Sequence, residues 1–257
     1  MKLLLSPAKK IDFEQKVSSD VELKLPVFNA DANELVRHLQ ELSSEELQSL
    51  MSISSDLANL NYNRYANWDF TDNKKSHFPA LWAFRGEVYT NLDVETLSSE
   101  ALKRANNSLR ILSGLYGVLG PSDLIQAYRL EMGTKFSFES YKNLYAYWKS
   151  RTTDLLNKEI DRDNDQIVVN LASTEYSKSI DMKKLNAEVV TPIFKDLKGD
   201  NYKVVSFWAK RARGLMTRYI LENGICDAEG LLGFDVSGYY YHTDMSKPNM
   251  PVFVRDH

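Results

Sequence analysis

The chain has 257 residues, a length that suits one large domain or two small ones and allows a sizeable core. Hydrophobic residues make up 43% and charged residues 26%, and the net charge of −3 gives no general attraction to nucleic acid or anionic membrane. The single cysteine, Cys226, excludes an intramolecular disulfide. Because no run of about 18 apolar residues is present, we expect no membrane span and a cytoplasmic protein.

The hydrophobic pattern alternates between strand and helix along the chain. In chain order it predicts a buried strand at 2–5, helices within 31–60 with a capped start at "SSEE" (43–46), two helices within 79–106, a strand or helix end at 108–114, a helix at 139–158, strands at 166–173, 187–194 and 202–209, a helix at 211–223 and a C-terminal hairpin. We therefore expect a single α/β or α+β domain over 1–257, with a mixed β-sheet flanked by helices.

The segment "LSGLYGVLGPSDL" (112–124) holds glycines at a spacing of three, Gly114, Gly117 and Gly120. It fails the P-loop pattern, because Pro121 stands where lysine is required, and its spacing fails the Rossmann fingerprint. Its order is closer to a helix-hairpin-helix element, in which Gly114 to Gly117 would let backbone N–H groups approach a phosphate. The alternative is a tight turn between packed elements.

A second segment, "FWAKRARGLMTRY" (207–219), is basic within an acidic chain. Lys210 and Arg213 share one helical face, and Arg211 and Arg218 share another. Arginine forks suit phosphate and carboxylate ligands. A solvated face with salt bridges is the alternative interpretation.

Two shorter segments add candidate polar groups. "SPAKKID" (6–12) follows the first strand, where Ser6 could bind an oxyanion and Lys9 a phosphate. In "AYRLEMG" (127–133) the alternation predicts a strand that places Arg129 and Glu131 on one face, close enough to pair, with Asp123 nearby in sequence. Ser6, Lys9, Asp123 and Glu131 are the candidate catalytic residues, although an ordinary strand exit and a structural ion pair remain alternatives.

Other residues predict little chemistry. The histidines, His38, His77, His242 and His257, lie far apart, so we expect neither a metal site nor a cofactor. Cys226 has acidic neighbours in sequence, which disfavours a reactive thiolate. The segment "YNRYANW" (62–68) could stack on bases, but a partly buried aromatic cluster explains it equally well.

Five motifs in this order, "LLLSPAKKIDF", "LSGLYGVLGPSDLIQAYRLEMG", "VVNLASTEYSKSI", "KKLNAEVVTPIF" and "SFWAKRARGLMTRYI", resemble the bacterial peroxide-stress protein YaaA family over nearly the whole chain. The resemblance implies a compact α/β fold with a helix-hairpin-helix element, a basic cleft, a role in peroxide defence, a link to intracellular iron, and DNA as a ligand. The cleft would be lined by six residues of this chain: Lys9, Arg129, Lys210, Arg211, Arg213 and Arg218. In place of the basic residue that often precedes the family's proline, this chain has Gly120.

Two hypotheses follow. The first is a non-enzymatic, monomeric DNA binder in which Lys9, Arg129, Lys210 and Arg213 converge on one concave site, so that affinity falls steeply with salt. The second is an enzyme or binder for a small anion, such as a nucleotide, because the same residue types suit either ligand.

Overall fold

The computed structural model describes residues 1–14, 16–17, 22–71 and 77–256. Its helices are α1 (Asn29–Gln40), α2 (Ser44–Met51), α3 (Ser55–Ala66), α4 (Ala80–Ala83), α5 (Glu87–Leu92), α6 (Ser99–Ser108), α7 (Leu144–Asp163), α8 (Thr174–Ser177), α9 (Ser206–Asn223) and α10 (Ala228–Leu232). Its strands are β1 (Lys2–Leu5), β2 (Lys10–Ile11), β3 (Phe78–Pro79), β4 (Phe84–Arg85), β5 (Leu109–Ser113), β6 (Gly117–Leu119), β7 (Leu124–Ile125), β8 (Ile167–Asn170), β9 (Glu188–Val190), β10 (Ile193–Lys198), β11 (Asn201–Lys203), β12 (Tyr239–Tyr241) and β13 (Val252–Arg255). The predicted mixed α/β class is confirmed.

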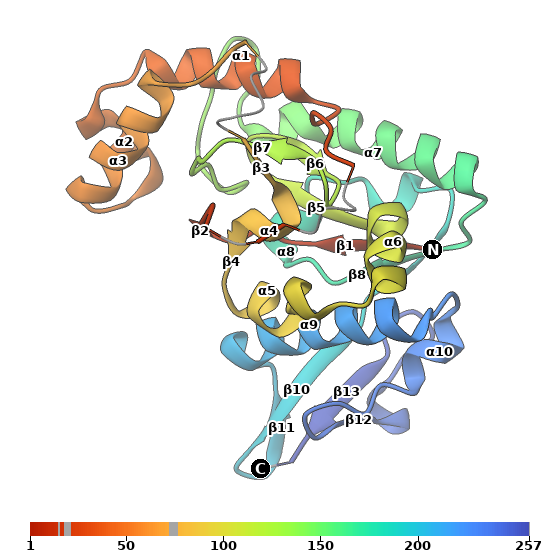
Figure 1. Ribbon diagram of the computed structural model, residues 1–257. Coiled ribbons are helices and arrows are strands. Elements are labelled where there is room, and N and C mark those ends of the chain that lie inside the picture. Colours follow the sequence, from red (N-terminus) through yellow and green to blue (C-terminus); the bar gives the residue numbers. More distant parts are fainter. Residues whose placement is uncertain (15, 18–21, 72–76, 257) are drawn as a thin grey trace.

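The largest sheet of the described part has the order β6-β5-β1-β8-β9. Strand β1 lies between β5 and β8 and is parallel to both, whereas β6 returns antiparallel to β5. Because residues 3–5 of β1 are apolar and the strand is buried throughout, its short "LLL" run can occupy the centre of a parallel sheet. Helix α6 packs on β1 and β5, and α7 packs against β6 (Figure 1).

A second sheet, in the order β11-β10-β13-β12, lies beyond α9 (Figure 1). Helix α9 contacts α5 and α6 on one side and β10 on the other. A Cβ atom at Gly214 would lie 2.1 Å from the carbonyl oxygen of Val88, so α9 and α5 can approach this closely only with glycine there. The predicted C-terminal hairpin is present as the antiparallel pair β12 and β13.

Helices α1 to α3 form an arm that reaches away from the main sheet (Figure 1). The capping box predicted at "SSEE" is confirmed, because the Ser43 side chain accepts from the Glu46 N–H and the Glu46 carboxylate accepts from the Ser43 N–H. Helix α2 ends at Met51, and the C-cap residue Ser52 takes a left-handed φ of 51°. None of the described helices has the length and apolar character needed to cross a membrane.

Two predicted strands are wrong in part. The segment 202–209 continues as a strand only to Lys203, and α9 begins at Ser206, because its apolar side chains pack against α5 and β10 rather than a neighbouring strand. The segment 127–133 is irregular despite its alternation, since the Arg129 carbonyl accepts from the Tyr65 hydroxyl instead of a strand partner.

Candidate functional site

The carboxyl ends of β1, β5 and β8 meet at one edge of the main sheet, the place where open α/β sheets hold their ligands. Ser6 follows β1 directly, and its Oγ atom accepts from the Ser173 N–H at 2.8 Å and lies 3.2 Å from the Ser173 hydroxyl. The Tyr89 hydroxyl, from α5, donates to the Ser6 carbonyl oxygen at 2.9 Å. These contacts fix the Ser6 loop at what we call the carboxyl edge.

Two of the predicted cations meet at the carboxyl edge. The Lys9 Nζ lies 3.1 Å and the Arg129 Nη2 2.7 Å from the same oxygen, Oε1 of Glu131. The Lys9 side chain is 67% exposed, whereas that of Arg129 is only 16% exposed and its buried Nε has no hydrogen-bond partner among the described residues. One carboxylate therefore pairs with two cations. The predicted pairing of Arg129 with Glu131 is confirmed, although the segment that carries them is not a strand.

Three buried tyrosines that the sequence did not single out add hydroxyl groups here. Burial raises the pKa of Tyr89, Tyr128 and Tyr176. Electrostatic repulsion from Tyr128 raises the pKa of Tyr89 and Tyr176 further. The Tyr128 and Ser113 hydroxyls lie 2.6 Å apart. The Tyr89 hydroxyl already donates to the Ser6 carbonyl oxygen and the Tyr128 hydroxyl is bonded to Ser113, so these two tyrosines hold the edge in place. Sequence reasoning missed the three tyrosines because they lie on separate elements.

The glycine segment is a β-hairpin, and the predicted helix-hairpin-helix at Gly114 to Gly117 is wrong. Strand β5 turns into β6, and residues 109–126 are buried throughout. A Cβ at Gly114 would lie 2.2 Å from the Leu130 carbonyl oxygen, and one at Gly117, where φ is +66°, would lie 2.6 Å from the Trp148 ring. The N–H groups of residues 115 and 116 donate to the Ser113 hydroxyl. These glycines serve packing, so neither is part of an exposed phosphate cradle.

Asp123 lies apart from Ser6. Its carboxylate accepts from the Gly120 N–H at 2.7 Å and faces Lys24 at 3.7 Å. Because Leu119 is opposite Ile111 in the β5–β6 pair, the turn after β6 lies toward the amino end of β5. Burial raises the pKa of Asp123 to about 6, although the hydrogen bond from Gly120 and the charge of Lys24 both act to lower it. Asp123 thus closes the turn and does not join the candidate catalytic residues.

The four α9 cations divide into two kinds. Arg218 donates to the carbonyl oxygens of Leu92 and Asp93 at the end of α5, and Arg211 bonds Asn91 and stacks on Trp208, so both have structural partners. Lys210 is exposed. Arg213 is half-buried, burial lowers its pKa, and among the described residues its guanidinium has no hydrogen-bond or ion-pair partner. The predicted convergence of Lys210 and Arg213 with Lys9 and Arg129 stays a prediction.

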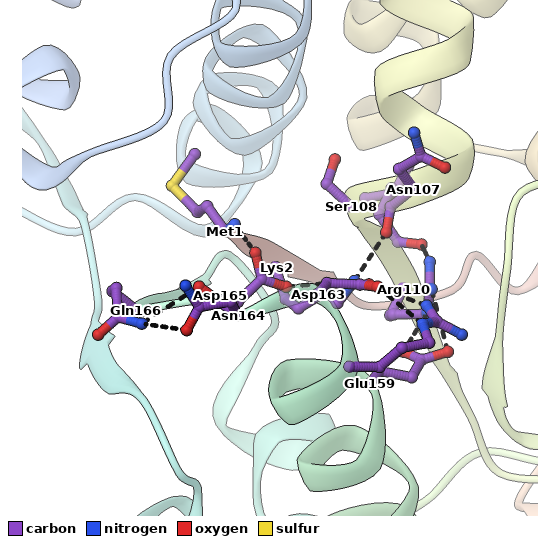
Figure 2. Close-up of polar contacts among 12 residues, drawn as sticks. Met1, Lys2, Asn107, Ser108, Arg110, Glu159, Asp163, Asn164, Asp165 and Gln166 are labelled. Carbon is purple, nitrogen blue, oxygen red and sulfur yellow. Dashed lines mark hydrogen bonds and ion pairs between the residues drawn. The ribbon is translucent and has the colours of Figure 1, made fainter.

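At the opposite, amino edge of the sheet, charges are paired with one another (Figure 2). The buried Lys2 ammonium pairs with Asp163 and Asp165, and the N-terminal amine also pairs with Asp165. A hydrogen bond from Arg162 is the main reason why the pKa of Asp163 is lowered. These groups line a cavity of about 750 Å³ that also includes the exposed Cys226.

One group of ligand-type side chains bears on the expectation of no metal site, which stays untested. Glu34, His38 and Glu139 place ligand-type atoms within 4.8 Å of one another. The helical spacing of Glu34 and His38 was visible in the sequence, but the third residue comes from a distant loop. Of the other histidines, His257 lies outside the described residues.

The fold is an open α/β sheet. Its carboxyl edge carries two cations that share one carboxylate, together with serine hydroxyls, and is a candidate anion-binding site. A family model described as peroxide stress protein YaaA matches residues 1–245. The chain therefore belongs to the peroxide stress protein YaaA family, as the five sequence motifs indicated.

Close relatives cover the full chain. A UPF0246 protein of Shewanella oneidensis is 46% identical over 259 residues, spanning 100% of this chain and 99% of its own length. One from Shewanella sediminis is 49% identical and one from Shewanella loihica 47% identical, each with the same coverage.

Proposed function

We propose that this protein acts in peroxide stress by binding phosphate groups at the carboxyl edge, with the DNA backbone as ligand. The observation that carries the proposal is the pair of cations, Lys9 and Arg129, that share a single carboxylate oxygen of Glu131. A shared carboxylate leaves part of their charge uncompensated. A phosphate oxygen would supply the missing negative charge, chiefly at the exposed Lys9 ammonium.

The cations of α9 extend this proposal along the surface. Helix α9 packs tightly on α5, the helix whose Tyr89 holds the Ser6 loop. Arg213 and Lys210 would then supply further phosphate contacts beside the edge, whereas Arg211 and Arg218 are held by α5 and Trp208. The net charge of −3 requires such a local arrangement, since the chain as a whole repels polyanions.

A second candidate ligand is a small anion such as a nucleotide. It is favoured by the low exposure of Arg129, at 16%, and by the hydroxyls of Ser6 and Ser173, which lie at the same carboxyl edge of the sheet. A recessed guanidinium with hydroxyl donors suits a phosphate ester that enters between side chains. The link to iron that the resemblance implies is not supplied by this edge, because cations and hydroxyl donors do not attract a metal ion.

The test compares DNA and nucleotide binding in the wild type and in Lys9→Gln, with Lys158→Gln, an exposed lysine of α7, as the matched control. For DNA, we expect Lys9→Gln to reduce the slope of log affinity against log salt by about 0.9, the value for one phosphate contact, and Lys158→Gln to leave it unchanged. A loss of affinity for ATP but not for a 20-base-pair duplex would favour the small ligand. Equal binding by both variants, or binding of neither ligand by the wild type, contradicts the proposal.

A further inference from the structure

A cluster of three donor side chains joins the helical arm to the loop before α7. Glu34 and His38 lie one turn apart on α1, and both are half-buried. Glu139, from the loop that precedes α7, completes the cluster, with its Oε1 atom 3.5 Å from the His38 Nε2 atom. All three ligand-type atoms lie within 4.8 Å of one another.

Surrounding residues hold two of these donors in place. The Tyr147 hydroxyl donates to the Glu34 carboxylate at 2.9 Å, and the His38 ring packs on the Phe138 ring at 5.4 Å. Hydrogen bonds from outer residues to a carboxylate, and packing against an imidazole, orient ligands in metal sites. The Glu34 and His38 side chains are therefore directed by residues on α7 and on the loop before it.

The charge of the cluster is not balanced by the neighbouring arginine. Arg151 pairs with Asp31 at 3.2 Å and lies 4.1 Å from the centre of the Tyr147 ring. Within the described residues, Glu34 and Glu139 make no ion pair with a lysine or an arginine, and His38 is their only cationic partner when it is protonated. With a neutral imidazole the three side chains carry two negative charges, which a divalent cation would compensate.

We propose that Glu34, His38 and Glu139 bind a first-row divalent transition-metal ion. Nitrogen and carboxylate ligands lie about 2.0–2.2 Å from such an ion, which sets ligand separations at about 3.4 Å in a tetrahedral site and up to about 4.3 Å for ligands on opposite sides of the ion. From a spread of at most 4.8 Å the donors need to close by up to about 1.4 Å, which the exposed Glu139 can provide by side-chain rotation. One imidazole with two carboxylates suits Mn²⁺, Fe²⁺ or Zn²⁺ better than Ca²⁺, which takes oxygen ligands.

This site is separate from the carboxyl edge and goes beyond the phosphate-binding function. Its residues belong to α1 and the loop before α7, whereas Lys9 and Arg129 follow β1 and β7 in the chain. A failure of one proposal therefore leaves the other standing, because the two tests use different ligands and different variants.

The experiment is a calorimetric titration of the full-length protein with Zn²⁺ and with Mn²⁺ in a non-chelating buffer, repeated at pH 7.5 and pH 5. We expect one ion per chain at pH 7.5 and weaker binding at pH 5, because the ion competes with protons for the ligands. His38→Gln and Glu139→Gln should each weaken binding by about tenfold or more. His242→Gln, which removes a histidine of the C-terminal sheet region, is the matched control and should bind as the wild type does.

Glu139 is exposed, so its isosteric replacement keeps the fold and separates a lost ligand from a lost structure. Circular dichroism of each variant checks that point. No binding of either ion below about 1 mM by the wild type overturns the proposal. Binding that is equal in Glu139→Gln and His242→Gln also overturns it, since the ion would then be held elsewhere.

Discussion

The two edges of the main sheet both gather charged side chains, but they compensate them differently. At the amino edge, Lys2 is 2% exposed and faces two aspartates, and Arg110 pairs with Glu159 at 2.7 Å (Figure 2). At the carboxyl edge, Lys9 and Arg129 divide one carboxylate between them. A paired and buried network contributes to the fold, whereas charge left without a full partner is available to a ligand. The density of charge alone does not distinguish a binding site from a structural one.

The largest effect should come from the hairpin that supports the carboxyl edge. Gly117→Ala should lower the free energy of unfolding by about 3–4 kcal/mol, because its left-handed φ strains any side chain and the new Cβ meets the Trp148 ring. Gly120→Ala is the matched control, since its Cβ would meet only ordinary contacts with Asp123, starting at 3.4 Å. Urea denaturation of both variants measures the difference. Equal stabilities would show that the hairpin tolerates a side chain at Gly117 and would weaken its assignment to packing.

The next effect tests the amino edge directly. Lys2→Met should cost about 3 kcal/mol of stability, because it leaves the buried Asp165 and the partly buried Asp163 with fewer compensating charges. Lys9→Gln, at the opposite edge, removes an exposed cation and should change stability by less than about 0.5 kcal/mol. Chemical denaturation compares the two. If Lys9→Gln proves as costly as Lys2→Met, the contrast between the edges is wrong.

A pH experiment probes Asp123, a buried carboxylate near the amino end of β5 whose nearest cation, Lys24, lies 3.7 Å away. The pKa of Asp123 is raised to about 6 from 3.8, so between those values the folded state holds more protons than the unfolded state. Stability from this group is therefore full below pH 4 and falls by about 2–3 kcal/mol as the pH rises through 6.

Asp123→Asn should abolish that decline while keeping the oxygen that accepts from the Gly120 N–H. The change in unfolding free energy between pH 4 and pH 7 is measured for the wild type and for the variant, and the two changes are compared. An identical pH dependence in the two proteins would mean that Asp123 does not titrate in this range.

The smallest effect is expected at Cys226. The side chain is exposed and lines the amino-edge cavity, where the charged neighbours are already paired with one another. Cys226→Ser should change the free energy of unfolding by less than about 0.5 kcal/mol and leave survival of peroxide-treated cells unaltered. Loss of peroxide protection with an unchanged fold would assign a redox role to the amino edge.

The sequence by itself determined the elements whose signals are local. The capped start of α2 depends on residues three apart, and the buried strands β1 and β8 depend on short apolar runs. Five ordered motifs also identified the family. Each of these features is carried by neighbouring residues, so no knowledge of distant contacts was needed.

Only the tertiary structure decided the site. The glycines became a buried hairpin because Trp148 and the Leu130 backbone fill the space beside them, and the alternating segment 127–133 stayed irregular because Tyr65 and Gly114 lie against it. Lys9 meets Arg129 at Glu131, and His38 meets Glu139, across long stretches of chain. Such contacts depend on how the elements pack against one another and on which charged groups are left without a partner. Local patterns in a single sequence contain no information on either.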